Sequence, residues 1–173
     1  MNFERKDSSY VLPLCVIIAL AVILRFYEVN NNLWFDEIWT LIETVRLPFI
    51  ELITSYKSNN NHPLYSLLSH LMITVLGESS FSFRLISALA GVVSVAVIYL
   101  LSREFGSRRE ALAAALLLAT SYHHVFHSQQ ARGYTLLLVL LTLSTLFLYR
   151  AITAKERNTK NFTRIIHKGC RAA

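Results

Sequence analysis

Four apolar runs constrain the fold of this chain more than any other feature of its sequence. They cover about residues 10–27, 81–101, 111–126 and 134–149. A helix that crosses a bilayer needs roughly 17–25 residues of this kind. The last two runs are short, so they must include flanking residues or cross a thin region of the bilayer. We therefore predict an all-α, polytopic membrane protein with about four transmembrane helices.

The composition also favours a membrane protein. Hydrophobic residues make up 54% of the chain, and charged residues only 16%, against about 25% in soluble domains. The formal net charge is +6. In a membrane protein this excess is expected at the cytoplasmic ends of the helices, so we predict no nucleic-acid partner. Cys15 lies in an apolar run and Cys170 in a basic tail, which predicts no disulfide.

The distribution of basic residues predicts the direction in which the chain crosses the membrane. If four runs cross, then the N-terminus, the link 102–110 and everything after Tyr149 share one side. Most Lys and Arg residues lie on that side, which makes it cytoplasmic. We predict a multi-pass protein of the cell (cytoplasmic) membrane with both termini cytoplasmic. A fifth, shorter run at 63–77 would reverse this bias if it crossed, so we predict an interfacial or re-entrant segment there.

The first outer segment, residues 28–80, contains the stretch IWTLIETVRLPFIELITSYK at positions 38–57. Apolar residues recur in it at helical spacing, and Pro48 interrupts the pattern. We predict two short amphipathic helices that lie in the membrane interface. Gly91 within the second run and the alanines of 111–119 in the third predict close helix packing.

Asp36 and Glu37 follow the first run and stand between Trp34 and Trp39. One interpretation is a water-facing loop, with the two tryptophans as interfacial anchors. The other is that a carboxylate at the membrane surface, beside apolar walls, acts as a general base. These residues alone leave both interpretations open.

Further polar residues accompany the acidic pair on the outer side. His62 precedes Pro63, a combination typical of an extended residue at the start of a helix. His123 and His127 are spaced to share a helix face. They lack a nearby carboxylate, so the sequence supports no divalent metal and we predict no cofactor. The arginines at the outer ends of the runs are expected to reach lipid headgroups or to bind a phosphorylated ligand; they are Arg25, Arg84 and Arg132. For Arg25, pairing with Glu28 is a third expectation.

The order of the motifs is characteristic. The chain reads LWFDE at 33–37, NNNHPLYSLLSHL at 59–71, SFRLISALAGVVSVAVIYLLSREFG at 82–106 and SQQARGYTLLLVLL at 128–141. Over about residues 10–152 it resembles the N-terminal portion of a GT-C glycosyltransferase. It is similar to the protein O-mannosyltransferase-like and aminoarabinose-transferase-like enzymes of that superfamily.

The resemblance implies transfer of a sugar from a polyprenyl-phosphate donor to a lipid, glycan or protein acceptor at the extracytoplasmic face. It implies that Asp36 is the catalytic base and that Glu37 orients it or helps to hold the acceptor. His62 matches the first position of a His-Pro motif near the donor phosphate. Arg132 and Tyr134 match a motif on the second outer loop.

The resemblance also implies a domain organisation. Residues 1–152 are expected to form the N-terminal part of the transferase domain. The basic composition of residues 153–173 predicts a cytoplasmic tail, which over 155–173 is unfolded or lies on the membrane surface. Such enzymes have more spans, so we expect a truncation product or a short form, and we do not predict activity for this chain alone. Leu64 departs from the family, since many relatives have a second proline there. A small non-enzymatic four-span scaffold or assembly protein, and a transporter fragment, remain the alternatives.

The topology is testable by labelling single cysteines in a protein that lacks Cys15 and Cys170. A cysteine at Ser107 is expected to resist an impermeant thiol reagent added from outside, because the basic link 102–110 is predicted to be cytoplasmic. A cysteine introduced within 28–54 is expected to react. Labelling of position 107 from outside would contradict the four-span topology.

Overall fold

The computed structural model of the protein describes residues 3–54 and 62–169, with side chains for 10–54 and 62–155. The asparagines predicted to be outside at 59–61, Cys170 and the side chains of the basic tail beyond residue 155 lie outside these ranges. Free Cys15 is exposed.

All regular secondary structure in the described part of the chain is helical, which confirms the predicted all-α class. In chain order the elements are α1 (Phe3–Phe26), α2 (Phe35–Thr40), a π-helical turn η1 (Leu41–Val45), α3 (Phe49–Thr54), α4 (Pro63–Leu76), α5 (Ser80–Phe105), α6 (Arg108–Thr120), α7 (Tyr122–Ser128) and α8 (Tyr134–Gly169).

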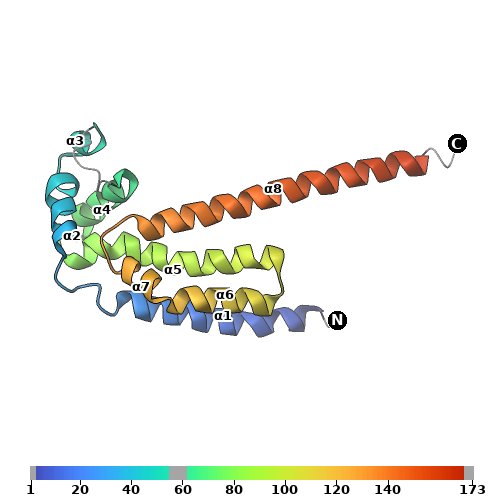
Figure 1. Cartoon of the computed structure of the whole chain (residues 1–173), viewed down its shortest axis with the longest axis horizontal. Helices are drawn as coiled ribbons and strands as arrows, with labels where there is room; N and C mark the ends of the chain where they lie inside the picture. The colour runs from blue at the N-terminus through green and yellow to red at the C-terminus, as the bar shows by residue number, and fades with distance from the viewer. Residues whose placement is uncertain (1–2, 55–61, 170–173) are drawn as a thin grey trace.

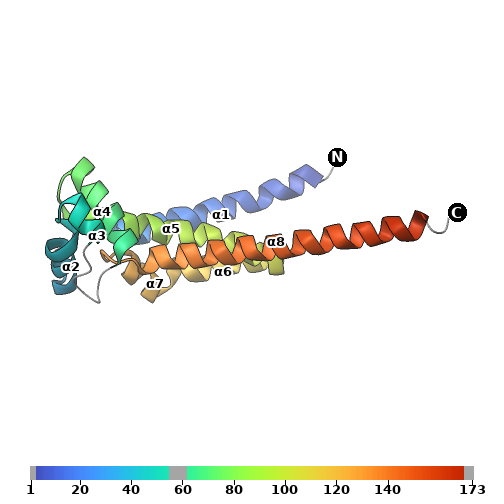
Figure 2. The same cartoon turned by 90° about the horizontal axis from the view of Figure 1, so that it is seen from above.

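Helix α5 is central to the arrangement and packs against α1, α4, α6, α7 and α8. The long helices run side by side, while α2, α3, α4 and α7 gather at one end of the bundle (Figures 1 and 2). The two ends of the chain lie toward the opposite end. Segments that are distant in sequence, before α4 and after α7, therefore meet at the same end of the molecule.

Within the described ranges, two helices are long and apolar enough to cross a membrane by length and composition: α5, and α8 over Tyr134–Lys155. Two shorter apolar helices cover Tyr10–Phe26 and Pro63–Leu76. Many large apolar side chains on the bundle are exposed, as expected for surfaces that face lipid. Examples are Leu12, Ile23, Leu117 and Phe147.

The predicted third run, 111–126, is not one helix. Helix α6 ends at Thr120, Ser121 has an extended backbone, and α7 begins at Tyr122. The last carbonyls of a helix have no partner within it. Here the carbonyls of Leu118 and Ala119 accept hydrogen bonds from the Arg25 side chain instead, which stabilises the break.

Two other expectations about local structure have different outcomes. The predicted break at Pro48 is confirmed, since η1 ends at Val45 and α3 begins at Phe49. The tail predicted over 153–173 is helical as far as Gly169, because α8 continues without interruption. The unfolded alternative is therefore wrong for the backbone of residues 155–169.

Arg25 is fully buried. Contrary to expectation, its side chain does not reach a lipid headgroup and does not pair with Glu28. Its guanidinium donates to the carbonyls of Ala21, Leu118 and Ala119 and lies 2.7 Å from Nδ1 of His124. The opposite ring nitrogen of His124 contacts the Ser94 hydroxyl at 2.9 Å. This polar network joins α1, α5, α6 and α7 because a buried cation must be hydrogen-bonded.

Close packing at Gly91 is what lets these helices meet. A Cβ at Gly91 would lie 2.3 Å from the Ser128 hydroxyl oxygen and 3.0 Å from Nε of Arg25. The prediction that Gly91 marks close helix packing is confirmed. Ala111, Ala115 and Ala119 are completely buried along α6 and serve the same purpose.

Gly91→Ala is expected to destabilise the bundle. Replacing a mid-helix glycine by alanine ordinarily stabilises by about 0.5–1 kcal/mol. Overpacking costs about 1–3 kcal/mol. This cost should exceed the gain from alanine here, because the added methyl group would contact Ser128 and a buried arginine. The thermal unfolding midpoint in detergent is the measurement, with Val93→Ala on the exposed side of α5 as control. A midpoint equal to or above the wild-type value would contradict this packing.

Candidate active site

The first turn of α2 sets the directions of the two adjacent carboxylates. Trp34 caps the helix, and the third helical residue, Glu37, folds back so that its carboxylate accepts a hydrogen bond from the Trp34 backbone N–H at 2.8 Å. Acidic residues favour the first turn of a helix because they offset the helix dipole and satisfy free N–H groups. Since Glu37 turns inward, its neighbour Asp36 projects outward, with 62% of its side chain exposed.

Glu37 is buried and forms a two-point ion pair with Arg84 of α5. The Nε–Oε1 and Nη2–Oε2 distances are 2.9 and 2.5 Å. The backbone N–H of Ala131 donates to the same carboxylate at 2.5 Å. Arg84 also donates to three backbone carbonyls of the loop before α2: Val29, Asn31 and Asn32.

Arg84 is therefore not directed at a lipid headgroup or a phosphorylated ligand, contrary to expectation. Only 2% of its side chain is exposed, and Glu37 and the loop carbonyls occupy its guanidinium. The sequence gives no signal for this pairing, because the two partners are 47 residues apart.

Asp36 and Arg132 form a second ion pair with an oxygen–nitrogen distance of 2.5 Å. It joins α2 to the loop between α7 and α8, so the two polar segments 28–80 and 123–134 meet, as predicted. The Arg132 side chain is only 13% exposed, and its guanidinium carbon lies 6.0 Å from the centre of the Tyr134 ring. The Ser87 hydroxyl donates to the Arg132 carbonyl at 2.7 Å, which fixes this loop on α5.

His62 lies on the other side of Tyr134. The two ring centres are 5.3 Å apart in an edge-on contact. Gly133 allows this approach, since a Cβ there would lie 3.1 Å from the His62 Cβ. Burial, and then the positive charge of Arg132, hold the pKa of the His62 imidazole below its usual value, which favours the neutral ring. Pro63 follows as the first residue of α4, as predicted.

The structure adds His127, to which the sequence analysis gave no role beyond a weak metal-ligand pattern. Its ring centre lies 5.0 Å from that of Tyr134. Within the described chain, Nδ1 of His127 and Nε2 of His62 are buried without a hydrogen-bond partner. Buried polar atoms normally have partners, so both nitrogens are suited to a polar ligand. A histidine two residues before the QQARGY motif was the signal for this in the sequence.

Two small cavities adjoin Tyr134. A polar cavity of about 210 Å³ includes Asp36, His127 and Arg132 in its lining. An apolar cavity of about 230 Å³ is lined by His62 and by leucines of α4 and α8, namely Leu64, Leu136, Leu137 and Leu140. An anion with an apolar substituent fits this combination of a cation and an apolar groove. Among the described residues, no group of three or more His, Cys, Asp or Glu side chains is arranged to hold a metal ion.

The buried pair is open to a direct test. Glu37→Gln keeps the shape of the side chain but leaves the Arg84 charge buried without its partner, which costs about 3–5 kcal/mol of unfolding free energy. The thermal unfolding midpoint should fall strongly. Glu78→Gln, which breaks an exposed ion pair with Arg46, is the matched control and should have little effect. Equal midpoints for the two variants would rule out a structural dependence on Glu37.

Comparison with known proteins gives one match. The family model described as dolichyl-phosphate-mannose-protein mannosyltransferase matches residues 60–166. No curated protein and no solved structure matches the chain. His62, Arg84, Arg132 and Tyr134 lie inside the matched region, whereas Asp36 and Glu37 precede it. Because the match covers more than half of the sequence, the chain belongs to the dolichyl-phosphate-mannose-protein mannosyltransferase family, a GT-C family of membrane glycosyltransferases.

Proposed function

We propose that this chain carries the donor site and the catalytic base of a glycosyltransferase that uses a polyprenyl-phosphate sugar. The family name points to dolichyl-phosphate-mannose or a related lipid as donor. The observation that carries the proposal is the Asp36–Arg132 ion pair, which lies in a polar cavity next to an apolar one. A base, a phosphate-binding cation and a groove for hydrocarbon are the three components that such a transfer needs.

Arg132 is the proposed contact for the donor phosphate, because a guanidinium binds phosphate oxygens through paired hydrogen bonds. The first isoprene units would lie in the apolar cavity beyond Tyr134. His62 borders that cavity, and its neutral ring has an N–H to donate to the phosphate. When the sugar departs, the lipid phosphate gains negative charge, and a fixed cation beside it lowers the energy of the transition state.

Asp36 is the proposed base. Its carboxylate takes the proton of the acceptor hydroxyl as the new oxygen–carbon bond forms at the anomeric carbon. The bond from that carbon to the phosphate oxygen breaks, and its electron pair leaves with the lipid phosphate. Without donor, the carboxylate contacts Arg132. A donor phosphate competes for the same guanidinium, so donor binding would release Asp36 for proton transfer. Glu37 would position Asp36 through its buried contacts.

We further propose that this end of the bundle faces the extracytoplasmic side of the cell membrane, with both termini cytoplasmic. The basic residues Arg103, Arg108 and Arg109 support this orientation, since they lie at the turn between α5 and α6, at the other end of these helices from the Asp36 site. The proposed acceptor is a lipid, glycan or protein on that side.

Substitutions of Asp36 and of Arg132 should impair different steps of the reaction. Asp36→Asn keeps hydrogen bonding but removes the base, so turnover should fall by about 10²–10⁴ with little change in donor affinity. Arg132→Ala should instead weaken donor binding by about 1.5–3 kcal/mol, since it removes a charge-assisted contact. The measurements are sugar transfer from a polyprenyl-phosphate donor and, separately, binding of that donor to the protein in lipid nanodiscs.

Arg46→Ala and Glu78→Gln are the matched controls for these two substitutions. They break an exposed ion pair at the same end of the bundle that borders neither of the two small cavities. Both should behave like wild type. Normal turnover in Asp36→Asn would remove the assignment of the base, and unchanged donor binding in Arg132→Ala would remove that of the phosphate contact.

A further inference from the structure

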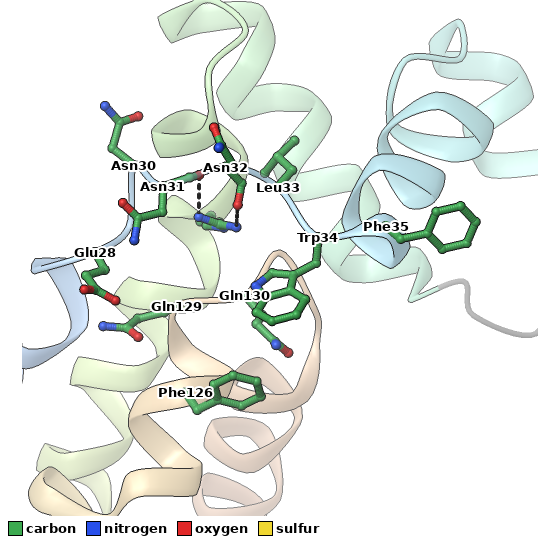
Figure 3. A pocket seen from close by; sticks show the side chains of 11 residues that line it. Glu28, Asn30, Asn31, Asn32, Leu33, Trp34, Phe35, Phe126, Gln129 and Gln130 are labelled. Atoms are coloured by element: carbon green, nitrogen blue, oxygen red, sulfur yellow. Dashed lines mark hydrogen bonds between the residues drawn. The ribbon is translucent and has the colours of Figure 1, made fainter.

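A third and larger cavity of about 760 Å³ adjoins the polar cavity of the proposed site. It lies between the loop before α2 and the loop that follows α7 (Figure 3). Trp34 and Gln130 line both this cavity and the one that contains Asp36 and Arg132. Its volume falls in the range of about 300–1,000 Å³ that is typical of small-molecule sites. A molecule bound in it would therefore adjoin the proposed base.

The lining of the larger cavity is rich in carboxamides and aromatic rings. Three asparagines precede α2 and two glutamines follow α7; they are Asn30, Asn31, Asn32, Gln129 and Gln130. Figure 3 shows Glu28, Asn31 and Gln129 grouped on one side, with the rings of Trp34 and Phe126 on the other. Carboxamides donate and accept hydrogen bonds at once, and aromatic faces pack against apolar C–H surfaces. A sugar ring has hydroxyl groups at its rim and C–H groups on its faces, so it matches both.

The charges in this cavity do not suit a phosphate. Its cation is Arg84, which is buried and engaged with Glu37 and three carbonyls. Glu28 adds a carboxylate to the lining. The side-chain amide of Gln129 is fixed by donation to the Leu24 carbonyl at 2.8 Å. The cavity therefore offers a neutral-to-negative, hydrogen-bonding surface next to a site whose cation is Arg132.

We propose that this cavity is the acceptor subsite and that it holds an uncharged sugar unit of a glycan. The proposal rests on the proposed function, because it takes the acceptor hydroxyl past Trp34 and Gln130 to Asp36. A peptide is the competing occupant, because the family description names a protein acceptor, and the test below includes one.

Tryptophan fluorescence provides a direct test, because the chain has two tryptophans. Trp39 lines none of the three cavities described above, so the Trp39→Phe protein reports on Trp34 alone. The full chain in detergent is titrated with methyl α-mannoside, cellobiose and N,N′-diacetylchitobiose, and with an uncharged Ser/Thr peptide with blocked ends. Saturable change of Trp34 emission by at least one sugar, and none by the peptide, is expected.

Variants in the lining identify the subsite. Asn31→Ala combined with Gln130→Ala should weaken sugar binding about tenfold or more, since each lost hydrogen bond contributes about 1 kcal/mol. The backbone carbonyl of residue 31, which Arg84 uses, is retained in this variant. The control is Glu78→Gln, because Glu78 lies at the same end of the bundle and lines none of the three cavities. It should bind nearly normally, and equal thermal unfolding midpoints show that all variants are folded.

The outcomes separate this proposal from the proposed function. Sugar binding that persists in Arg132→Ala, while donor binding is lost, supports two distinct subsites. Absence of saturable sugar binding, preference for the peptide, or equal losses in Glu78→Gln and the double variant would overturn the acceptor subsite. Those results would leave the Asp36 and Arg132 assignments intact, because these are measured with the donor.

Discussion

The buried ion pair between Glu37 and Arg84 is the interaction on which the rest of this site depends. Removing two charges from water is costly, and the attraction between them offsets that cost only when the remaining hydrogen-bonding groups also have partners. Here the carboxylate also accepts from the backbone of Trp34 and Ala131, and the guanidinium donates to three loop carbonyls. The pair thus fixes α2, the loop before it and the loop after α7 on one helix, α5.

The positions of Asp36 and Arg132 follow from this pair through chain connectivity. Asp36 precedes Glu37, and Arg132 follows Ala131, whose N–H donates to Glu37. The Asp36–Arg132 pair is therefore linked through adjacent residues to the Glu37–Arg84 pair. Arg25 acts similarly at the α6–α7 break, where it binds carbonyls that the end of α6 leaves without partners. In both places a buried arginine donates hydrogen bonds to backbone carbonyls that have no partner within a helix.

The sequence was sufficient for features that depend on local pattern. Apolar runs located α5 and the first part of α8, Pro48 located the break before α3, and the parity of the crossings brought Asp36 and Arg132 to one end. The sequence was insufficient where a contact with a residue distant in the chain determines the local structure. An arginine near the end of an apolar run gives the same pattern whether it reaches lipid, as expected for Arg25 and Arg84, or is buried against carbonyls. The break at Ser121 also depends on such a partner, since Arg25 takes the freed carbonyls.

The mutual neutralisation of Asp36 and Arg132 has a consequence for selectivity. A soluble phosphate compound that enters this cavity has to displace a carboxylate from the arginine and gains only another anion contact in exchange. A phosphate with a hydrocarbon chain gains in addition about 0.8 kcal/mol for each methylene that it buries, here against the leucines of α4 and α8. The Asp36 carboxylate thus competes with a phosphate for the Arg132 guanidinium. In the proposed function, a soluble sugar phosphate gains too little to displace Asp36, whereas a lipid-linked one displaces it through burial of its chain rather than through its charge.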